Sequence, residues 1–591
     1  MVYVAEAAPS GRGGVSCVSG TTSGNAASRA RLQRPARRHI ADAAFIVVVG
    51  SLPALFYTRG LGFYFDDHLF LGMMSTSQDQ SIGGLFDALA ADPKAQLRPL
   101  VYFLIATEYW LFGASPMPYH IVLAALVPMC AVALYALLVR LRLPRYLALA
   151  APVLFASAPH YSSVKLWPIL FSPTLSLTLA FISLLAGYSA VTARGNRAWL
   201  WLATACLTML ASVFMYETTL PLFAVAVLFH WLQAFRESGR WRYTAGVLTS
   251  VLAVALIVKL VAADRVGRET SYAIGFDNGF LHHIGYVVSG AVKVNFGTYG
   301  VGLPYVLSWT ALNRLTWSAV VAGAFVGVAT FVYLVRVAAV SVEELPAWRG
   351  RPASQYIAVA GLAVVVVGYS LFLTGANVFF TSVGIDNRVN MIPAVGMALI
   401  ALALILRALR LFSARRRPIV FALAVASLAA AGTFITTTIA GYWREAADHQ
   451  REVLSGLRAA LPEDPAGKTV ILDGTCPEVG PGIVFTAHYD LGGALQTIYR
   501  DPTLEGAVMT PVIGVESRGV VLTTLVYDRA EPRFYPYSRK LVVYDSRRHT
   551  LHVLSSRAKA QTYFASRPSL SCPPLRSFAW GLRTSRYLPF N

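Results

Sequence analysis

Long apolar stretches separated by short polar or basic segments constrain the fold of this chain more than any other feature of its sequence. A run of ~20 apolar residues is long enough to cross the hydrocarbon core of a bilayer as a helix. Of the 591 residues, 56% are hydrophobic and only 14% are charged, whereas soluble proteins are about one-quarter charged. The sequence therefore predicts an all-α, multispanning membrane protein.

About eleven transmembrane helices are predicted from these stretches, and several of them are shorter than a full crossing requires. The predicted spans are 43–57, 119–140, 146–160, 168–192, 198–215, 219–235, 243–262, 316–340, 355–375, 389–410 and 418–440.

The connecting loops predict the orientation, because short cytoplasmic loops carry an excess of lysine and arginine. With the N-terminus in the cytoplasm, every inner connection contains arginine, including the run at 415–417, and the outer loops hold fewer cations for their length. An odd number of spans then places the C-terminus outside. The net charge of +20 follows this placement, and since no basic stripe interleaved with aromatics accompanies it, we expect no nucleic-acid partner.

Three regions follow along the chain. Residues 1–40, rich in Gly, Ser, Ala and Arg, are expected to be a disordered, basic, cytoplasmic N-terminus. Residues 41–440 form the membrane domain, with two long outer loops at 59–118 and 263–315 and a short interfacial helix at 98–112. Residues 441–591 carry short β-favouring runs between Gly, Pro and Asp, which predict a small extracytoplasmic α+β or β-rich domain. These runs are 469–472, 483–485, 520–526, 541–544 and 550–554.

The cysteines and histidines give little sign of a metal site. None of the five cysteines forms a CxxC pair. Adjacent residues such as His282 and His283 project in different directions from a helix and do not readily share one ion. We predict no metal ligands and leave open whether a divalent cation serves as cofactor. Cys476 and Cys572 share the C-terminal region and could form a disulfide outside the cytoplasm, although spacing alone does not decide it.

An acidic pair, Asp66-Asp67, follows the first span within the sequence GFYFDDHLF and lies at the outer face in the predicted topology. Carboxylates are costly in lipid and tolerable at its edge, so a pair at this depth invites a functional explanation. The structural alternative is that the two acids cap the helix that follows.

Other polar residues predicted at the outer face suit a reaction at a lipid-linked phosphate, which needs a base and a cationic partner for the departing phosphate. The candidates for substrate or phosphate binding are Arg98, Lys165, Glu217, Arg388 and His68. Arg98 and Arg388 have the alternative of anchoring helices among headgroups. Glu217 could be a solvated turn residue, and Lys165 part of an ordinary polar turn.

Several of these residues carry a family likeness. Phe65-Asp66-Asp67-His68, Arg98-Pro99-Leu100, Phe112-Gly113 and Pro118-Tyr119-His120 resemble the first outer loop of GT-C-type glycosyltransferases, nearest the protein O-mannosyltransferases and their bacterial relatives. The turn from Glu217 to Pro221 is similar to a connection in that group. The likeness covers residues 43–240 best and does not extend to 441–591.

The resemblance implies a GT-C-like membrane domain in a bacterial inner or plasma membrane. It also implies an inverting transfer of a sugar from a polyprenyl-phosphate donor to a glycan, lipid or protein acceptor. In that scheme Asp66 is the general base, and Asp67 places the acceptor or assists an ion. The subgroup often has Asp-Glu at this point, which leaves the division of roles between the two aspartates open.

Other functions fit the same topology. A lipid-linked glycan polymerase or ligase would differ mainly in its donor. A polytopic transporter or flippase without transferase chemistry should instead place ionisable residues near the midplane. Lys259 is the clearest ionisable residue within a predicted span, close enough to its end to snorkel. A receptor or scaffold with 441–591 as its binding module is a third class.

Overall fold

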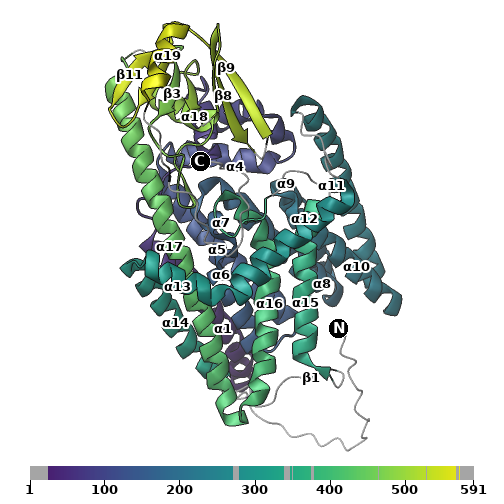
Figure 1. Ribbon diagram of the computed structural model, residues 1–591. Helices are drawn as coiled ribbons and strands as arrows, with labels where there is room; N and C mark the ends of the chain where they lie inside the picture. Colours follow the sequence, from purple (N-terminus) through teal and green to yellow (C-terminus); the bar gives the residue numbers. More distant parts are fainter. Residues whose placement is uncertain are drawn as a thin grey trace, which may run out of the picture. The chain divides into compact units, whose positions relative to one another are not determined.

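The computed structural model describes residues 24–237, 239–270, 279–338, 347–348, 351–373, 379–463, 465–510, 512–526, 529–567 and 572 (Figure 1). The chain divides into two compact units, residues 1–45 and 46–591, and the contacts described below lie within the second. Of the segment predicted to be disordered, residues 1–23 lie outside the described residues, and the chain is helical from Gly24.

Ten of the described helices are long and apolar enough to cross a membrane, and each coincides with a predicted span. They are α1 (Gly24–Ser51), α5 (Pro116–Arg140), α8 (Phe171–Thr192), α9 (Asn196–Met215), α10 (Leu220–Arg236), α11 (Arg240–Thr270), α14 (Trp317–Ala338), α15 (Ala353–Ser370), α16 (Met391–Ala408) and α17 (Arg417–Ala460). The multispanning, mostly helical architecture is therefore confirmed.

The eleventh predicted span, 146–160, is the helix α6 (Arg145–Ser157), which has only 13 residues. At 1.5 Å per residue it is ~20 Å long, which is short of the ~30 Å hydrocarbon core. Every residue of α6 from Tyr146 to Ser157 is buried, as expected for a helix that is apolar on all sides and packs inside a bundle. The helix is present as predicted, but a single straight crossing is beyond its length.

The two long loops predicted at the outer face, still called the first and second outer loop below, are themselves largely helical. The first contains α2 (Asp66–Ser75), α3 (Ile82–Ala90), η2 (Pro93–Gln96) and α4 (Pro99–Phe112), and the second contains α12 (Phe280–Val292), the π-helical turn η6 (Lys293–Val301) and α13 (Leu303–Asn313). The predicted short helix at 98–112 is α4, and it begins at Pro99, where a helix tolerates the missing N–H.

The C-terminal domain is an α+β structure, as predicted. Its main sheet has the order β11-β10-β3-β6, in which β3 (Thr469–Asp473) runs parallel to β6 (Glu505–Val508) and β10 (Leu541–Asp545), and β11 (Thr550–Val553) is antiparallel to β10. A second, antiparallel sheet joins β7 (Ile513–Val515), β8 (Gly519–Val526) and β9 (Arg529–Pro536). A short hairpin, β4 (Glu478–Val479) with β5 (Gly482–Ile483), and the helices α18 (His488–Tyr499) and α19 (Arg557–Ser566) complete it.

The predicted domain boundary at residue 441 lies inside α17, which continues to Ala460. The last turns of α17 supply Val453 and Leu457 to the same apolar core as Val470, Leu472 and Phe485 of the C-terminal domain. One helix therefore serves both as the last membrane span and as a core element of this domain. The change from apolar to polar residues near 441 marks the point at which α17 enters the C-terminal domain. The helix itself continues to Ala460.

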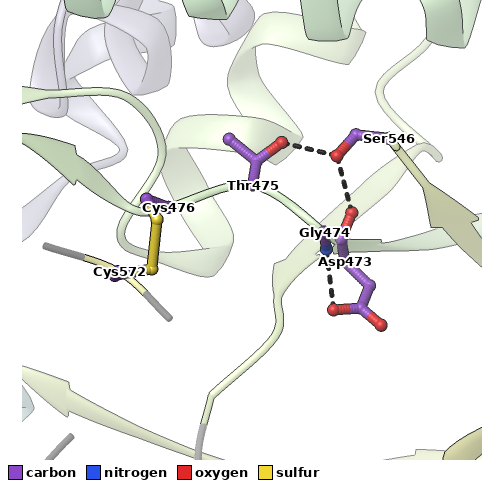
Figure 2. Close-up of a disulfide and its surroundings, with 6 residues drawn as sticks. All are labelled: Asp473, Gly474, Thr475, Cys476, Ser546 and Cys572. Atoms are coloured by element: carbon purple, nitrogen blue, oxygen red, sulfur yellow. Dashed lines mark hydrogen bonds between the residues drawn. A yellow bond between two sulfur atoms is a disulfide. The ribbon is translucent and has the colours of Figure 1, made fainter. Parts of the chain in front are cut away.

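Cys476 and Cys572 form a disulfide, with their Cα atoms 5.5 Å apart (Figure 2). The loop before Cys476 is held by hydrogen bonds, because Thr475 Oγ1 lies 2.6 Å from Ser546 Oγ, which donates to the Asp473 carbonyl oxygen at 2.9 Å. The disulfide thus ties Cys572 to the turn that follows β3.

Replacing both Cys476 and Cys572 with serine should destabilise the C-terminal domain. The two cysteines are 96 residues apart, and cross-linking a loop of roughly this length stabilises a fold by up to about 4.7 kcal/mol in the chain-entropy model. We expect a lower Tm in scanning fluorimetry of the detergent-solubilised protein. Cys206→Ser, which removes a cysteine outside the disulfide, is the control. Equal Tm values for the two variants would contradict the prediction.

Candidate functional site

Asp66 and Asp67 occupy the first turn of α2, directly after a strained residue. Phe65 has φ 48°, a left-handed value that non-glycine residues seldom adopt and that clusters at functional sites. This turn directs the Asp67 carboxylate back toward the preceding chain. Its Oδ2 accepts a hydrogen bond from Tyr64 N at 2.8 Å, and its Oδ1 accepts one from Ile169 N at 3.0 Å. Asp67, 6% exposed, therefore joins the first outer loop to the start of α8.

Asp66 has a different environment. It is half-buried, and within the described part of the chain its carboxylate has no hydrogen bond or ion pair. Burial raises the pKa of Asp66 above its usual value, while the positive charges of Lys94, Arg388 and Arg98 oppose that rise. Three cations from three separate elements are thus close enough to act on this carboxyl group. The nearby Asp92 adds to the rise, so the arrangement leaves Asp66 able to accept a proton beside three basic side chains.

Arg98, predicted as a phosphate ligand, forms an ion pair with Glu217 at the start of α10. Arg98 Nε donates to Glu217 Oε2 at 3.0 Å and Arg98 Nη2 donates to Oε1, a two-pronged geometry that suits guanidinium and carboxylate. The guanidinium also lies 4.3 Å from the Tyr216 ring centroid. The two predicted residues are therefore brought together, and Glu217 fixes the direction of Arg98.

Lys259 of α11 completes this cluster, which the sequence did not predict. Its Nζ lies 3.5 Å from Glu217 Oε2 and donates to the carbonyl oxygen of Leu97, next to Arg98. Lys259 is only 6% exposed, so it does not snorkel to the surface but holds the Leu97–Arg98 corner from inside the helix bundle. Two cations against one carboxylate leave the cluster with an excess positive charge.

Arg388 comes from η8 (Ile385–Asn390), far along the sequence. Its guanidinium lies 5.8 Å from the Trp167 ring centroid and 4.0 Å from the Asp386 carboxylate. Trp167 is fully buried and donates from Nε1 to the Tyr64 carbonyl oxygen at 2.9 Å. The same indole thus contacts the Asp66 loop and the Arg388 element, which explains why these two residues share one region.

Hydrogen bonds beneath η8 hold it in place. Asn387, fully buried, accepts from Ser163 N at 3.0 Å and donates to Ser162 Oγ at 2.8 Å. Asn390 donates to the His160 carbonyl oxygen at 3.2 Å. The element that presents Arg388 is therefore tied to the turn between α6 and α8.

His68 and Lys165, the other two predicted ligands, have their described contacts elsewhere. The His68 ring lies 5.6 Å from that of Phe485 in the C-terminal domain, and burial lowers its pKa to about 4. Lys165 Nζ donates to the carbonyl oxygens of Ala156 and Ala158 at 2.7 and 2.8 Å, at the end of α6. Burial lowers the pKa of Lys165 to about 7.

The C-terminal domain contributes to the rim of the site, which the sequence did not predict. Burial and the nearby Asp386 raise the pKa of Glu478 in β4 to about 7, and the Tyr489 ring of α18 lies 5.0 Å from that of Phe65. Helix α18 packs directly on α2, because a Cβ on Gly72 would lie 2.7 Å from the Cα of Gly493. Lys94 was also missed, and its only signal was a lone lysine in an acidic loop.

Among the residues that the structure describes, no three His, Cys, Asp or Glu side chains come together in a way that could hold a metal ion. His283 Nε2 lies 2.8 Å from the Phe372 carbonyl oxygen.

Comparison with known proteins gives only distant similarity. No protein-family model matches the sequence, and no curated protein matches it. Two solved structures of ArnT from Cupriavidus metallidurans, a GT-C glycosyltransferase, are similar to this chain. The structure bound to undecaprenyl phosphate is 14% identical, with 80% of this chain and 86% of that chain covered, at a TM-score of 0.36. The apo structure is 15% identical, with 81% and 86% covered, at the same TM-score of 0.36.

A likeness at this TM-score carries no argument about activity, and it does not single out the protein O-mannosyltransferase subgroup.

A double-mutant cycle tests the cluster around Glu217. Glu217→Gln and Lys259→Met should each lower the Tm, because the first removes the carboxylate that both cations share and the second removes the bonds that Lys259 makes to Glu217 and to the Leu97 carbonyl oxygen. In the double variant, the loss of unfolding free energy should be smaller than the sum of the two single losses. The difference is a coupling energy of ~0.5–3 kcal/mol, as for residues in one network. Lys293→Met, an exposed lysine outside the cluster, combined with Glu217→Gln is the control and should be additive within about 0.5 kcal/mol. Additivity of both pairs would contradict the cluster.

Proposed function

We propose that this chain is a GT-C-type glycosyltransferase that moves a sugar from a polyprenyl-phosphate donor to an acceptor at the outer face of the membrane, with inversion. The observation that carries the proposal is the position of Asp66. It is a half-buried carboxylate without a described partner, and Lys94, Arg98 and Arg388 all act on it electrostatically. A base beside several cations is what transfer from a phosphate-linked donor requires.

In the proposed reaction, Asp66 takes the proton from an acceptor hydroxyl as its oxygen attacks the anomeric carbon. The bond between that carbon and the phosphate oxygen breaks on the opposite side of the sugar, which inverts the configuration. The polyprenyl phosphate leaves with the bonding electrons, and the positive charges of Arg388, Lys94 and Arg98 stabilise it. Because a phosphate is already a good leaving group, no acid catalyst is needed.

The remaining residues of the site position these groups. Asp67 accepts two backbone hydrogen bonds, which fixes the turn that presents Asp66. Glu217 pairs with Arg98, and Lys259 donates to the carbonyl oxygen of the preceding residue, Leu97. Pre-positioning of this kind lowers the entropic part of the barrier.

The disulfide supports an extracytoplasmic location for the site. Disulfides persist in oxidising compartments and are rare in the cytosol. Since α18 of the disulfide-bonded domain packs on α2, the Asp66 loop belongs to the same side of the membrane as that domain. A cytoplasmic N-terminus and a bacterial plasma membrane complete the proposed setting.

The central test compares Asp66→Asn with Asp67→Asn. Asp66→Asn should lower kcat by ~10²–10⁴-fold, the usual contribution of a general base, with donor binding retained. Asp67→Asn should act mainly through a lower Tm, since Asp67 holds the backbone of the loop. The measurement is sugar transfer from a radiolabelled polyprenyl-phosphate sugar by purified, folded protein. Full turnover by Asp66→Asn would exclude this mechanism.

Lys94 provides a test based on pH. The base must be deprotonated to act, and burial raises the pKa of Asp66 while Lys94 lowers it. Lys94→Met should therefore raise that pKa further and move the acidic limb of the kcat/KM profile to higher pH. Lys94→Arg, which keeps the charge, should leave the limb near its original position. If the acidic limb were at the same pH in the parent protein and in both variants, Lys94 would have no effect on the pKa of Asp66.

The donor distinguishes the proposed activity from the alternative functions. A lipid-linked glycan polymerase or ligase would use the same base with an oligosaccharide-diphosphate donor. Turnover with that donor and none with a monosaccharide phosphate would favour it. A flippase would move labelled donor across vesicles of the reconstituted protein even when Asp66 is replaced.

A further inference from the structure

The second outer loop exposes an unusual amount of apolar surface. Leu281, Val301 and Leu312 are 82%, 89% and 86% exposed, and Val288 and Val292 are about half exposed. Trp317, just after the loop, is 84% exposed. Leu281, Val288 and Val292 repeat at intervals of seven and four residues, so they share one face of α12. Burying a side chain of this kind is worth about 1.5–3 kcal/mol, so a stripe of them left in water would be costly.

The C-terminal domain serves as an internal comparison. Among its described residues from 465 to 567, the exposed large apolar side chains are Val512, Phe534 and Val553, none above 58%. The C-terminal domain therefore covers most of its large apolar side chains, as a domain in contact with water does. The exposed apolar surface of the second outer loop therefore indicates an environment other than water.

The helices of this loop are too short to cross a membrane. Helix α12 has 13 residues and α13 has 11, which correspond to ~20 and ~16 Å. Residues 279–317 also contain no Asp or Glu, and the exposed Lys293 has a stem long enough to reach headgroups. This combination of short helices, an apolar face and cations only is typical of helices that lie in the membrane interface.

Buried side chains of the same loop fix it to the protein by polar contacts. Asn295, fully buried, donates to Tyr369 Oη at 2.6 Å, and Tyr369 donates in turn to Asn390 of η8. Tyr299 Oη donates to the Ser382 carbonyl oxygen at 2.6 Å. The buried side chains of the loop thus hold the element that carries Arg388, and other side chains of the loop are apolar and exposed.

We propose that α12, η6 and α13 lie in the outer interface of the bilayer, with the face marked by Leu281, Val301 and Leu312 against lipid. The loop continues into α14, whose exposed side chains Val321, Val328 and Val332 form the lipid-facing stripe of a membrane span. Trp317 at the start of that span is at the position where membrane proteins concentrate tryptophan. The bilayer surface thereby becomes a direct neighbour of η8. This inference does not depend on the proposed transferase activity.

Fluorescent labels at single cysteines test the location. Leu281→Cys and Leu312→Cys are each labelled with an environment-sensitive nitrobenzoxadiazole probe and reconstituted into phosphatidylcholine vesicles with or without brominated acyl chains. Both labels should emit at shorter wavelength than in water and lose fluorescence in the brominated vesicles. Thr550→Cys, on an exposed position of the C-terminal domain, is the matched control and should show neither effect. The parent protein, treated in parallel, gives the background from its own cysteines.

Two outcomes would overturn the proposal. Labels at 281 and 312 that behave like the label at 550 would place the loop in water. Shorter-wavelength emission without bromine quenching would mean that protein, such as a second copy of this chain, covers the face. A monodisperse elution profile for each labelled variant ensures that the result reports on folded protein.

Discussion

The two hydrogen bonds accepted by Asp67 are the interaction on which the candidate site depends. One comes from the chain just before α2 and the other from the start of α8, so a single buried carboxylate joins two parts of the sequence about one hundred residues apart. A carboxylate that is nearly removed from water is tolerable only when its oxygens are well bonded. Tyr64 extends this junction, because its hydroxyl donates to the Trp443 carbonyl oxygen of α17 at 2.8 Å.

The geometry of this junction determines where the Asp66 side chain lies. Asp67 is turned inward, so its neighbour Asp66 is left near the surface, within the field of cations on η2, α4 and η8. Trp167 lies between the Asp66 loop and η8 and is itself anchored to the loop backbone. The different surroundings of two adjacent, chemically identical side chains therefore come from the backbone around them.

The membrane helices could be predicted from sequence because an apolar run of sufficient length has few other stable forms. The β-strands near 470, 520 and 542 were also evident from their residue types. The sequence does not show which partner a polar side chain contacts. Nothing local shows that Lys165 donates to carbonyl oxygens at the end of α6, or that Lys259 reaches Glu217 rather than the membrane surface. Glu478 and Tyr489 were out of reach for the same reason, since their relation to the site depends on how the C-terminal domain packs on α2 and α17.

The contact between Gly72 and Gly493 has a consequence for how this protein can vary. A methyl group on Gly493 would lie 2.1 Å from the His68 carbonyl oxygen, so neither helix can gain even an alanine there without the other retreating. The outer loop and the C-terminal domain are consequently not interchangeable modules. A C-terminal domain taken from a related chain would need a glycine at the position of Gly493 in order to pack on α2. The two surfaces are therefore expected to change together in evolution.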